Sequence, residues 1–241
     1  MKKRLLALVL ALVMIFSLVP VTSSAATFAV SLWFHNTTGY AKFEKNPSST
    51  PAYYSVVDGS VALWEGETPP EKNYIKVLYT NTDYPHVELT LNEINIESNR
   101  TDKNTGNAAI YFSWSSGKDY AITINLIGEN KISSGMNAGL RVAGKLGTTI
   151  TGSGSLIMEG TNPDGNIIQE NGGDLTFKDT TVSLNNKHGG WYHGIFVNGA
   201  GADVIIDGSD VTSLVRFSSA PVDLTPTPKI PITFPLSTVL M

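Results

Sequence analysis

The sequence contains no cysteine, few charged residues (16%), and no long apolar segment after residue 26. Without cysteine the chain can form neither a disulfide nor a thiolate metal site. Its second half also lacks the 3.6-residue apolar period of amphipathic helices. A chain of this kind has to be stabilised by an apolar core of strands, by bound cations, or by both.

Residues 1–26 are typical of a secretory signal peptide. Three basic residues (2–4) precede an apolar run, Leu5–Val19, and small residues follow up to a cleavage site near Ala25 or Ala26. The alternative is a membrane anchor, but a span needs roughly 20 apolar residues. We therefore expect an exported protein, extracellular or at the cell surface, with no membrane span after cleavage.

Removal of this leader takes away three positive charges and changes the formal net charge from −4 to −7. An acidic chain argues against nucleic acid and against anionic membranes as partners. It is compatible with calcium or with neutral polymers. The remaining chain of about 215 residues can bury a sizeable core in one or two domains, and we expect a monomer.

The stretch 86–214 repeats itself. Five similar segments, each with alternating apolar residues around a Gly, Asn or Asp break, begin at Val87, Ala121, Thr148, Asp174 and Asp203. Equivalent apolar positions at Ile132, Met158 and Leu184 lie 26 residues apart. A fixed period of this size is the signature of a solenoid, whose coils bury their apolar sides only by stacking.

The period within each segment is two, so the sequence predicts strands rather than helices. Short corners with Gly and Asn supply the tight turns between them. The predicted fold is all-β, a right-handed parallel β-helix over residues 86–214. The residues predicted to face its core are Leu89, Leu91, Ile94, Ile96, Ile122, Ile124, Leu126, Leu175, Phe177, Val182 and Leu184.

Residues 27–85 are rich in aromatics and read as several short strands separated by turns, such as Asp58-Gly59. We interpret this region as a β-rich cap over the exposed N-terminal coil. The alternative is a small separate β-domain that binds a ligand through its aromatic residues.

Residues 215–241 contain five prolines, at positions 221, 226, 228, 231 and 235. Proline at this density cannot donate to a strand ladder and is typical of an extended linker. We therefore expect low order after about residue 216.

Four segments carry a family resemblance: ITINLIGENKIS (122–133), AGLRV (138–142), TTITGSGSLIMEG (148–160) and GDLTFKDTTVSL (173–184). Together they resemble the carbohydrate-binding parallel β-helix domains of bacterial secreted and surface proteins. The resemblance covers roughly residues 86–214 and implies the same fold, with plant-type or cell-wall polysaccharide as the partner. It is less informative about the ligand, because Gly at corners and Ile in ladders are structural.

The first candidate site is an outward column of side chains on the solenoid. If Phe112, Val142, Ile168 and Val197 all face inward in one column, the residues before them point out together, namely Tyr111, Arg141, Ile167 and Phe196. Coils stack about 4.8 Å apart, so these four would form one surface stripe. An aromatic and cationic stripe suits the apolar faces and hydroxyl groups of sugar rings. The alternative is that another segment covers it.

The second candidate is the insertion KHGGWYHG (187–194), which interrupts a coil. Trp191 and Tyr192 could stack against a sugar, and the neighbouring His188 and His193 could bind a metal. The alternative is a loop folded back onto a coil edge.

The third candidate is a calcium site built from carboxylates at corners, chiefly Asp164, Asp174, Asp203 and Asp207. No stretch has the spacing of a known calcium loop. Aspartate also favours turns by bonding to its own backbone, which is the competing explanation.

Catalysis has less support. The sequence has no Gly-x-Ser-x-Gly, HExxH or phosphate-loop motif. A polysaccharide lyase would need a cationic base beside a carboxylate-held calcium, and a hydrolase would need paired carboxylates.

We therefore predict non-catalytic polysaccharide binding, with calcium as a candidate ion that assists it. The alternatives are a structural stalk or adhesin that binds a protein partner, and a polysaccharide lyase-like enzyme.

Overall fold

The computed structural model describes residues 30–35, 39–45, 48–80, 86–98, 108–113, 120–142, 144–162, 165–186 and 194–213. All regular secondary structure in these ranges is β-strand, which confirms the all-β prediction. Within them, no helix has the length and apolar character needed to cross a membrane. The predicted leader (1–26) and the proline-rich segment (215–241) lie outside the described residues.

The N-terminal strands are β1 (Val30–His35), β2 (Tyr40–Lys45), β3 (Ser48–Val57), β4 (Ser60–Leu63) and β5 (Tyr74–Thr80). The following strands are β6 (His86–Asn92), β7 (Asn95–Ser98), β8 (Ala108–Ser113), β9 (Ala121–Ile127), β10 (Glu129–Ser134), β11 (Ala138–Val142), β12 (Thr148–Thr151), β13 (Ser155–Gly160), β14 (Asn166–Glu170), β15 (Leu175–Lys178), β16 (Thr181–Asn186), β17 (Ile195–Val197), β18 (Val204–Asp207) and β19 (Asp210–Ser213).

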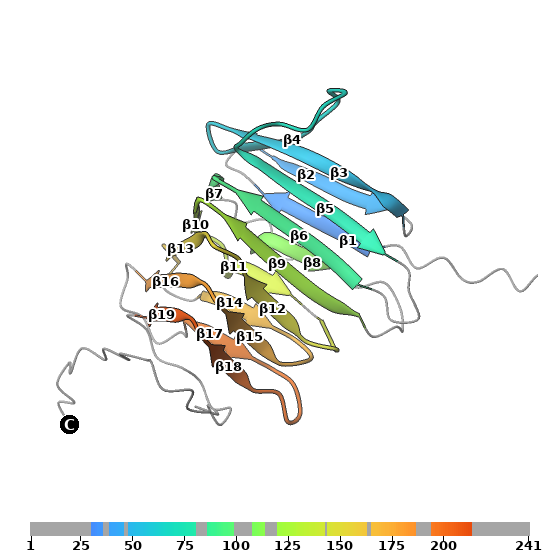
Figure 1. Cartoon of the computed structure of the whole chain (residues 1–241). Helices are drawn as coiled ribbons and strands as arrows, with labels where there is room; N and C mark the ends of the chain where they lie inside the picture. Colours follow the sequence, from blue (N-terminus) through green and yellow to red (C-terminus); the bar gives the residue numbers. More distant parts are fainter. Residues whose placement is uncertain are drawn as a thin grey trace, which may run out of the picture.

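Strands β6 to β19 wind into the predicted parallel β-solenoid (Figure 1). Every third strand stacks on its predecessor, so the coils build three sheets. Their orders are β17-β14-β11-β8-β1-β2, β19-β16-β13-β10-β7 and β18-β15-β12-β9-β6-β5-β3-β4. The predicted 26-residue ladder is confirmed, because Met158 pairs with both Ile132 and Leu184.

The core is a stack of aliphatic ladders between the three sheets. All eleven residues predicted to face inward are at most 1% exposed. Alternation therefore identified the core side of these strands correctly, because a strand with one buried face must place apolar residues at every second position.

The corner between β9 and β10 is held from inside by Asn130, which is fully buried. Its Oδ1 accepts the Ile94 N–H at 3.2 Å, and its Nδ2 lies 3.1 Å from the Ile127 carbonyl and 3.2 Å from the Ser155 carbonyl. These partners belong to three successive coils. The amide thus supplies the acceptor for the buried Ile94 N–H, and it adds a donor to the Ile127 carbonyl, which also accepts the Glu93 N–H at 3.1 Å.

The N-terminal strands continue two of the solenoid sheets in the antiparallel sense. Strand β1 pairs with β8, and β5 pairs with β6. The predicted turn at Asp58-Gly59 joins β3 to β4, and both residues have positive φ (48° and 76°), as the favoured two-residue hairpin turn requires. Strands β1 to β5 therefore cover the first coil, and their buried residues belong to the same core cluster as those of the coils.

Candidate functional site

The predicted surface stripe lies on the six-stranded sheet, with one change in its members. Arg141 pairs with Tyr111 on β8 and with Gln169 on β14, and Gln169 pairs with Phe196 on β17. Tyr111, Arg141 and Phe196 are therefore adjacent on one face, as predicted, and each is half-buried. The fourth member is Gln169.

The placement of Ile167 in this stripe was wrong. Ile167 and Ile168 are both buried, at 1% and 0% exposure, so two consecutive residues face the core at the start of β14. A Cβ on Gly160, at the end of β13, would lie 3.4 Å from Ile167 Cγ1. The stripe was predicted with Ile168 opposite Val142, but the ladder pairs Ile168 with Leu140 and Glu170 with Val142, so Gln169 lies beside Arg141.

The N-terminal strands extend the same face. Trp33 on β1 is paired with Tyr111 on one side and with Lys42 of β2 on the other. We refer to the resulting line of side chains across six strands as the outer row. Its members, in sheet order, are Lys42, Trp33, Tyr111, Arg141, Gln169 and Phe196.

Aromatic and cationic side chains contact one another along the outer row. Lys42 Nζ lies 4.7 Å from the centre of the Trp33 ring, and the Arg141 guanidinium carbon lies 5.4 Å from the centre of the Tyr111 ring. Tyr40, 47% exposed, meets Trp33 edge to face with ring centres 4.8 Å apart. These cation–π and edge contacts hold the side chains in fixed positions on a flat sheet.

A polar amide, Gln169, lies between Arg141 and Phe196 in the row. Gln169 donates from Nε2 to Asn171 Oδ1 at 3.0 Å, which orients the glutamine amide along the surface. Neighbouring strands lie about 4.8 Å apart, so the six strands place the row over about 24 Å. The repeat could not predict that β1 pairs with β8, and this pairing adds two of the six members of the row, Lys42 and Trp33.

Trp191, Tyr192 and Asp164 lie outside the described residues, as do His188 and His193. Their predicted roles in sugar stacking and metal binding are therefore not tested.

Two of the predicted calcium ligands lie at one corner. The Asp174 carboxylate accepts the Asp203 backbone N–H of the next coil at 2.9 Å, so it bonds between coils rather than to its own turn. Asp207 is exposed and is paired in the ladder with Lys178. Within the ranges that the structure covers, no three His, Asp or Glu side chains are grouped so as to hold a metal ion.

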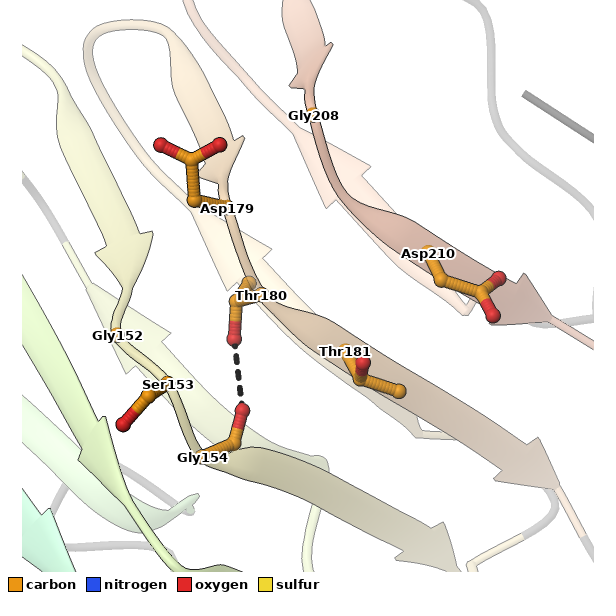
Figure 2. Close-up of a pocket in the computed structure, with 8 residues that line it drawn as sticks. All are labelled: Gly152, Ser153, Gly154, Asp179, Thr180, Thr181, Gly208 and Asp210. Carbon is orange, nitrogen blue, oxygen red and sulfur yellow. Dashed lines mark hydrogen bonds between the residues drawn. The ribbon is translucent and has the colours of Figure 1, made fainter. Parts of the chain in front are cut away.

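A shallow polar pocket lies at a different corner, where β12 is followed by β13, β15 by β16 and β18 by β19 in three successive coils (Figure 2). Its lining includes Asp179, which has positive φ (50°), and Thr180, whose Oγ1 donates to the Gly154 carbonyl at 3.2 Å. The carboxylates of Asp179 and Asp210 point in different directions in Figure 2. The pocket therefore shows no shared ligand position for these two acids.

Sequence reasoning missed a buried acid beneath the outer row. Glu170 is 0% exposed and shares an inward column with Val142 and Val197, where Ile168 had been expected. Its Oε2 accepts a hydrogen bond from Thr148 Oγ1 at 2.5 Å, whereas Oε1 has no hydrogen-bond partner.

Burial raises the Glu170 pKa from 4.5 to about 7, against the opposing effects of Thr148 and of nearby backbone amides. Burial also raises the pKa of Tyr120, and the negative charge of the nearby Glu170 raises it further. The sequence did contain a signal for this burial. Glu170 lies two residues after the buried Ile168, and residues two apart in a strand face the same side.

Searches against protein-family models, curated proteins and solved structures find no match to this chain. The resemblance to carbohydrate-binding β-helix domains therefore stays a prediction from the repeat motifs, and the geometry of the outer row carries the argument about function.

Proposed function

We propose that the protein binds polysaccharide outside the cell without catalysis, and that the outer row is its binding surface. The observation that carries this proposal is the continuous line of aromatic, cationic and amide side chains over six paired strands, of which all but the exposed Lys42 are half-buried. Aromatic faces stack against the apolar faces of sugar rings, and fixed polar groups nearby bond to hydroxyls.

The shape of the row supports a polymer rather than a single sugar. It crosses a six-stranded sheet and is about 24 Å long, because five strand spacings of about 4.8 Å separate Lys42 from Phe196. A small ligand would favour a concave site. Arg141 has an aromatic residue, Tyr111, and an amide, Gln169, as its ladder neighbours.

The test is retention of the purified chain, from residue 27 onward, on insoluble cellulose and on pectin gel, with and without a calcium chelator. We expect Trp33→Ala/Tyr111→Ala to lower the affinity by at least about tenfold, or about 1.4 kcal/mol. The row loses both central aromatic faces in this variant.

The matched control is Tyr53→Ala/Tyr74→Ala. These two tyrosines form an edge-to-face pair with ring centres 5.7 Å apart on the eight-stranded sheet, away from the row. Equal loss of binding in both double variants would contradict the assignment of the site. Loss only with chelator would move the site to carboxylates, and no retention of the wild type would favour a stalk or adhesin.

A further inference from the structure

Glu170 lies on β14, directly behind the outer row. Its ladder partners on the neighbouring strands are Val142 of β11 and Val197 of β17. Gln169, the residue before it, is a member of the row, and Asn171, the residue after it, accepts a hydrogen bond from the Gln169 side-chain amide at 3.0 Å. The buried carboxyl and the outer row are therefore carried by the two faces of one short strand.

The Glu170 carboxyl is closed off from solvent. Its side chain is 0% exposed, Oε2 accepts from Thr148 Oγ1 at 2.5 Å, and Oε1 has no hydrogen-bond partner among the described residues. Backbone amides of Gly144, Asn171 and Gly173 favour the ionised form, but burial opposes it more strongly. The neutral acid fits this space, whereas a carboxylate would need water at Oε1.

Two corner segments close the space around the carboxyl, 144–147 after β11 and 171–174 after β14. A Cβ on Gly173 would lie 2.5 Å from Gly147 N and 2.7 Å from the Gly144 carbonyl oxygen, so the two segments are in direct backbone contact. Because the backbones touch, water can reach the carboxyl from this side only if the two corner segments separate.

Separation of the corner segments would reach the outer row through Asn171. This residue begins the second segment, its backbone N–H donates to the Val142 carbonyl at 3.0 Å, and its side chain accepts from Gln169. Gln169 in turn lies between Arg141 and Phe196 in the row. A movement that displaces Asn171 therefore releases the Gln169 amide from its fixed position.

The titratable group that faces Glu170 most closely is Tyr120, which precedes β9. Burial raises its pKa, and the charges of Glu170, Tyr111 and Tyr79 raise it further, so Tyr120 stays neutral where Glu170 titrates. The charged side chains on the neighbouring segments are exposed or half-buried, namely Arg141, Lys145 and Asp174.

We propose, on the premise that the outer row binds polysaccharide, that Glu170 is a proton-controlled latch for this row. The neutral carboxyl keeps the corner segments together and Gln169 in place, and loss of its proton favours their separation and weakens binding. Ligand and proton then favour the same closed state, so affinity is highest at acidic pH and falls as pH rises. Burial raises the Glu170 pKa to about 7, which puts the change near neutral pH. Glu170 is thus a positioning residue.

Retention of the chain from residue 27 onward at two pH values tests the proposal. We expect the wild type to bind at least about fivefold more weakly at about pH 8.5 than at about pH 5.5. The polymers are insoluble cellulose and pectin gel, neither of which changes its charge over this range. Glu170→Gln stays neutral and should bind at both pH values as the wild type does at the lower one. Glu129→Gln removes an exposed acid and should follow the wild type.

A second measurement does not depend on the polymer. The side-chain amide NMR signals of Gln169 and Asn171 should shift with a midpoint at about pH 7 in the wild type and stay constant in Glu170→Gln.

Three results would each overturn the latch: equal wild-type affinity at the two pH values, a change of affinity that persists in Glu170→Gln, or amide signals that do not shift. A persistent change would assign the effect to another group, such as the buried His35 beside Trp33. Failure of the wild type to bind at either pH would contradict the proposed function instead, and the amide signals would still decide whether the latch exists.

Discussion

At the scale of single residues, Glu170 is the group with the largest consequence for pH dependence. Its carboxyl is fully buried, and burial raises its pKa to about 7. The folded chain therefore binds a proton that the unfolded chain releases at lower pH. Stability falls as pH rises from about 4.5 to about 7 and stays lower above that range.

We expect Glu170→Gln to remove this loss. Each pKa unit corresponds to about 1.4 kcal/mol, so the wild type should lose about 3 kcal/mol of unfolding free energy that the variant retains. Urea unfolding between pH 4.5 and 8 measures the difference. Glu129→Gln changes an exposed acid in the same way and should follow the wild type. Identical pH profiles for Glu170→Gln and the wild type would contradict the role assigned to this residue.

Residue-level prediction succeeded within strands and failed in the register between two of the coils. The repeat placed Tyr111, Arg141 and Phe196 on one face because a period of two continues through each of their strands. It misplaced Ile167 because the predicted register of β14 was two residues off, since Ile168 pairs with Leu140 and not with Val142. Ile167 is also buried directly before the buried Ile168, so alternation does not hold at the start of β14.

At the scale of elements, the corners depend on side chains that lie inside the coil. Asn130 bonds to backbone groups in three successive coils. We expect Asn130→Ala to lower the unfolding free energy by about 2–4 kcal/mol, because it leaves the Ile94 N–H buried without an acceptor. Urea denaturation measures this change, with the exposed Asn198→Ala as control. A loss as small as that of the control would show that water replaces the amide.

The existence of most strands could be predicted from alternation and turn residues, but pairing across long sequence separations could not. Strand β1 pairs with β8 through contacts such as Trp33 with Tyr111, about eighty residues apart. Nothing in the repeat specifies an antiparallel partner for β8. Two of the six members of the outer row, Lys42 and Trp33, were missed for this reason.

At the scale of the whole molecule, the N-terminal strands and the coils share one core. Tyr54 of β3 is 3% exposed, packs on Phe34 of β1 with ring centres 5.1 Å apart, and donates to the Lys42 carbonyl at 3.2 Å. It thus connects the eight-stranded sheet to the six-stranded sheet.

We expect Tyr54→Ala to lower the unfolding free energy by about 3–5 kcal/mol, through the cavity and the lost hydrogen bond. Because the core is shared, native-state hydrogen exchange should accelerate in β9 as well as in β3. Tyr53→Ala, on the half-buried outer face of β3, should cost far less. Acceleration confined to residues 30–80 would instead indicate a separate N-terminal domain.

The direction of the interstrand hydrogen bonds has a mechanical consequence. The ladders between β9, β12, β15 and β18 run along the axis on which the coils stack (Figure 1). A pull along this axis loads one coil interface at a time, because each coil contacts only its neighbours. The molecule would then lengthen in discrete steps, each adding the extended length of one unfolded coil. A chain pulled through its ends would therefore extend coil by coil before the whole fold is lost.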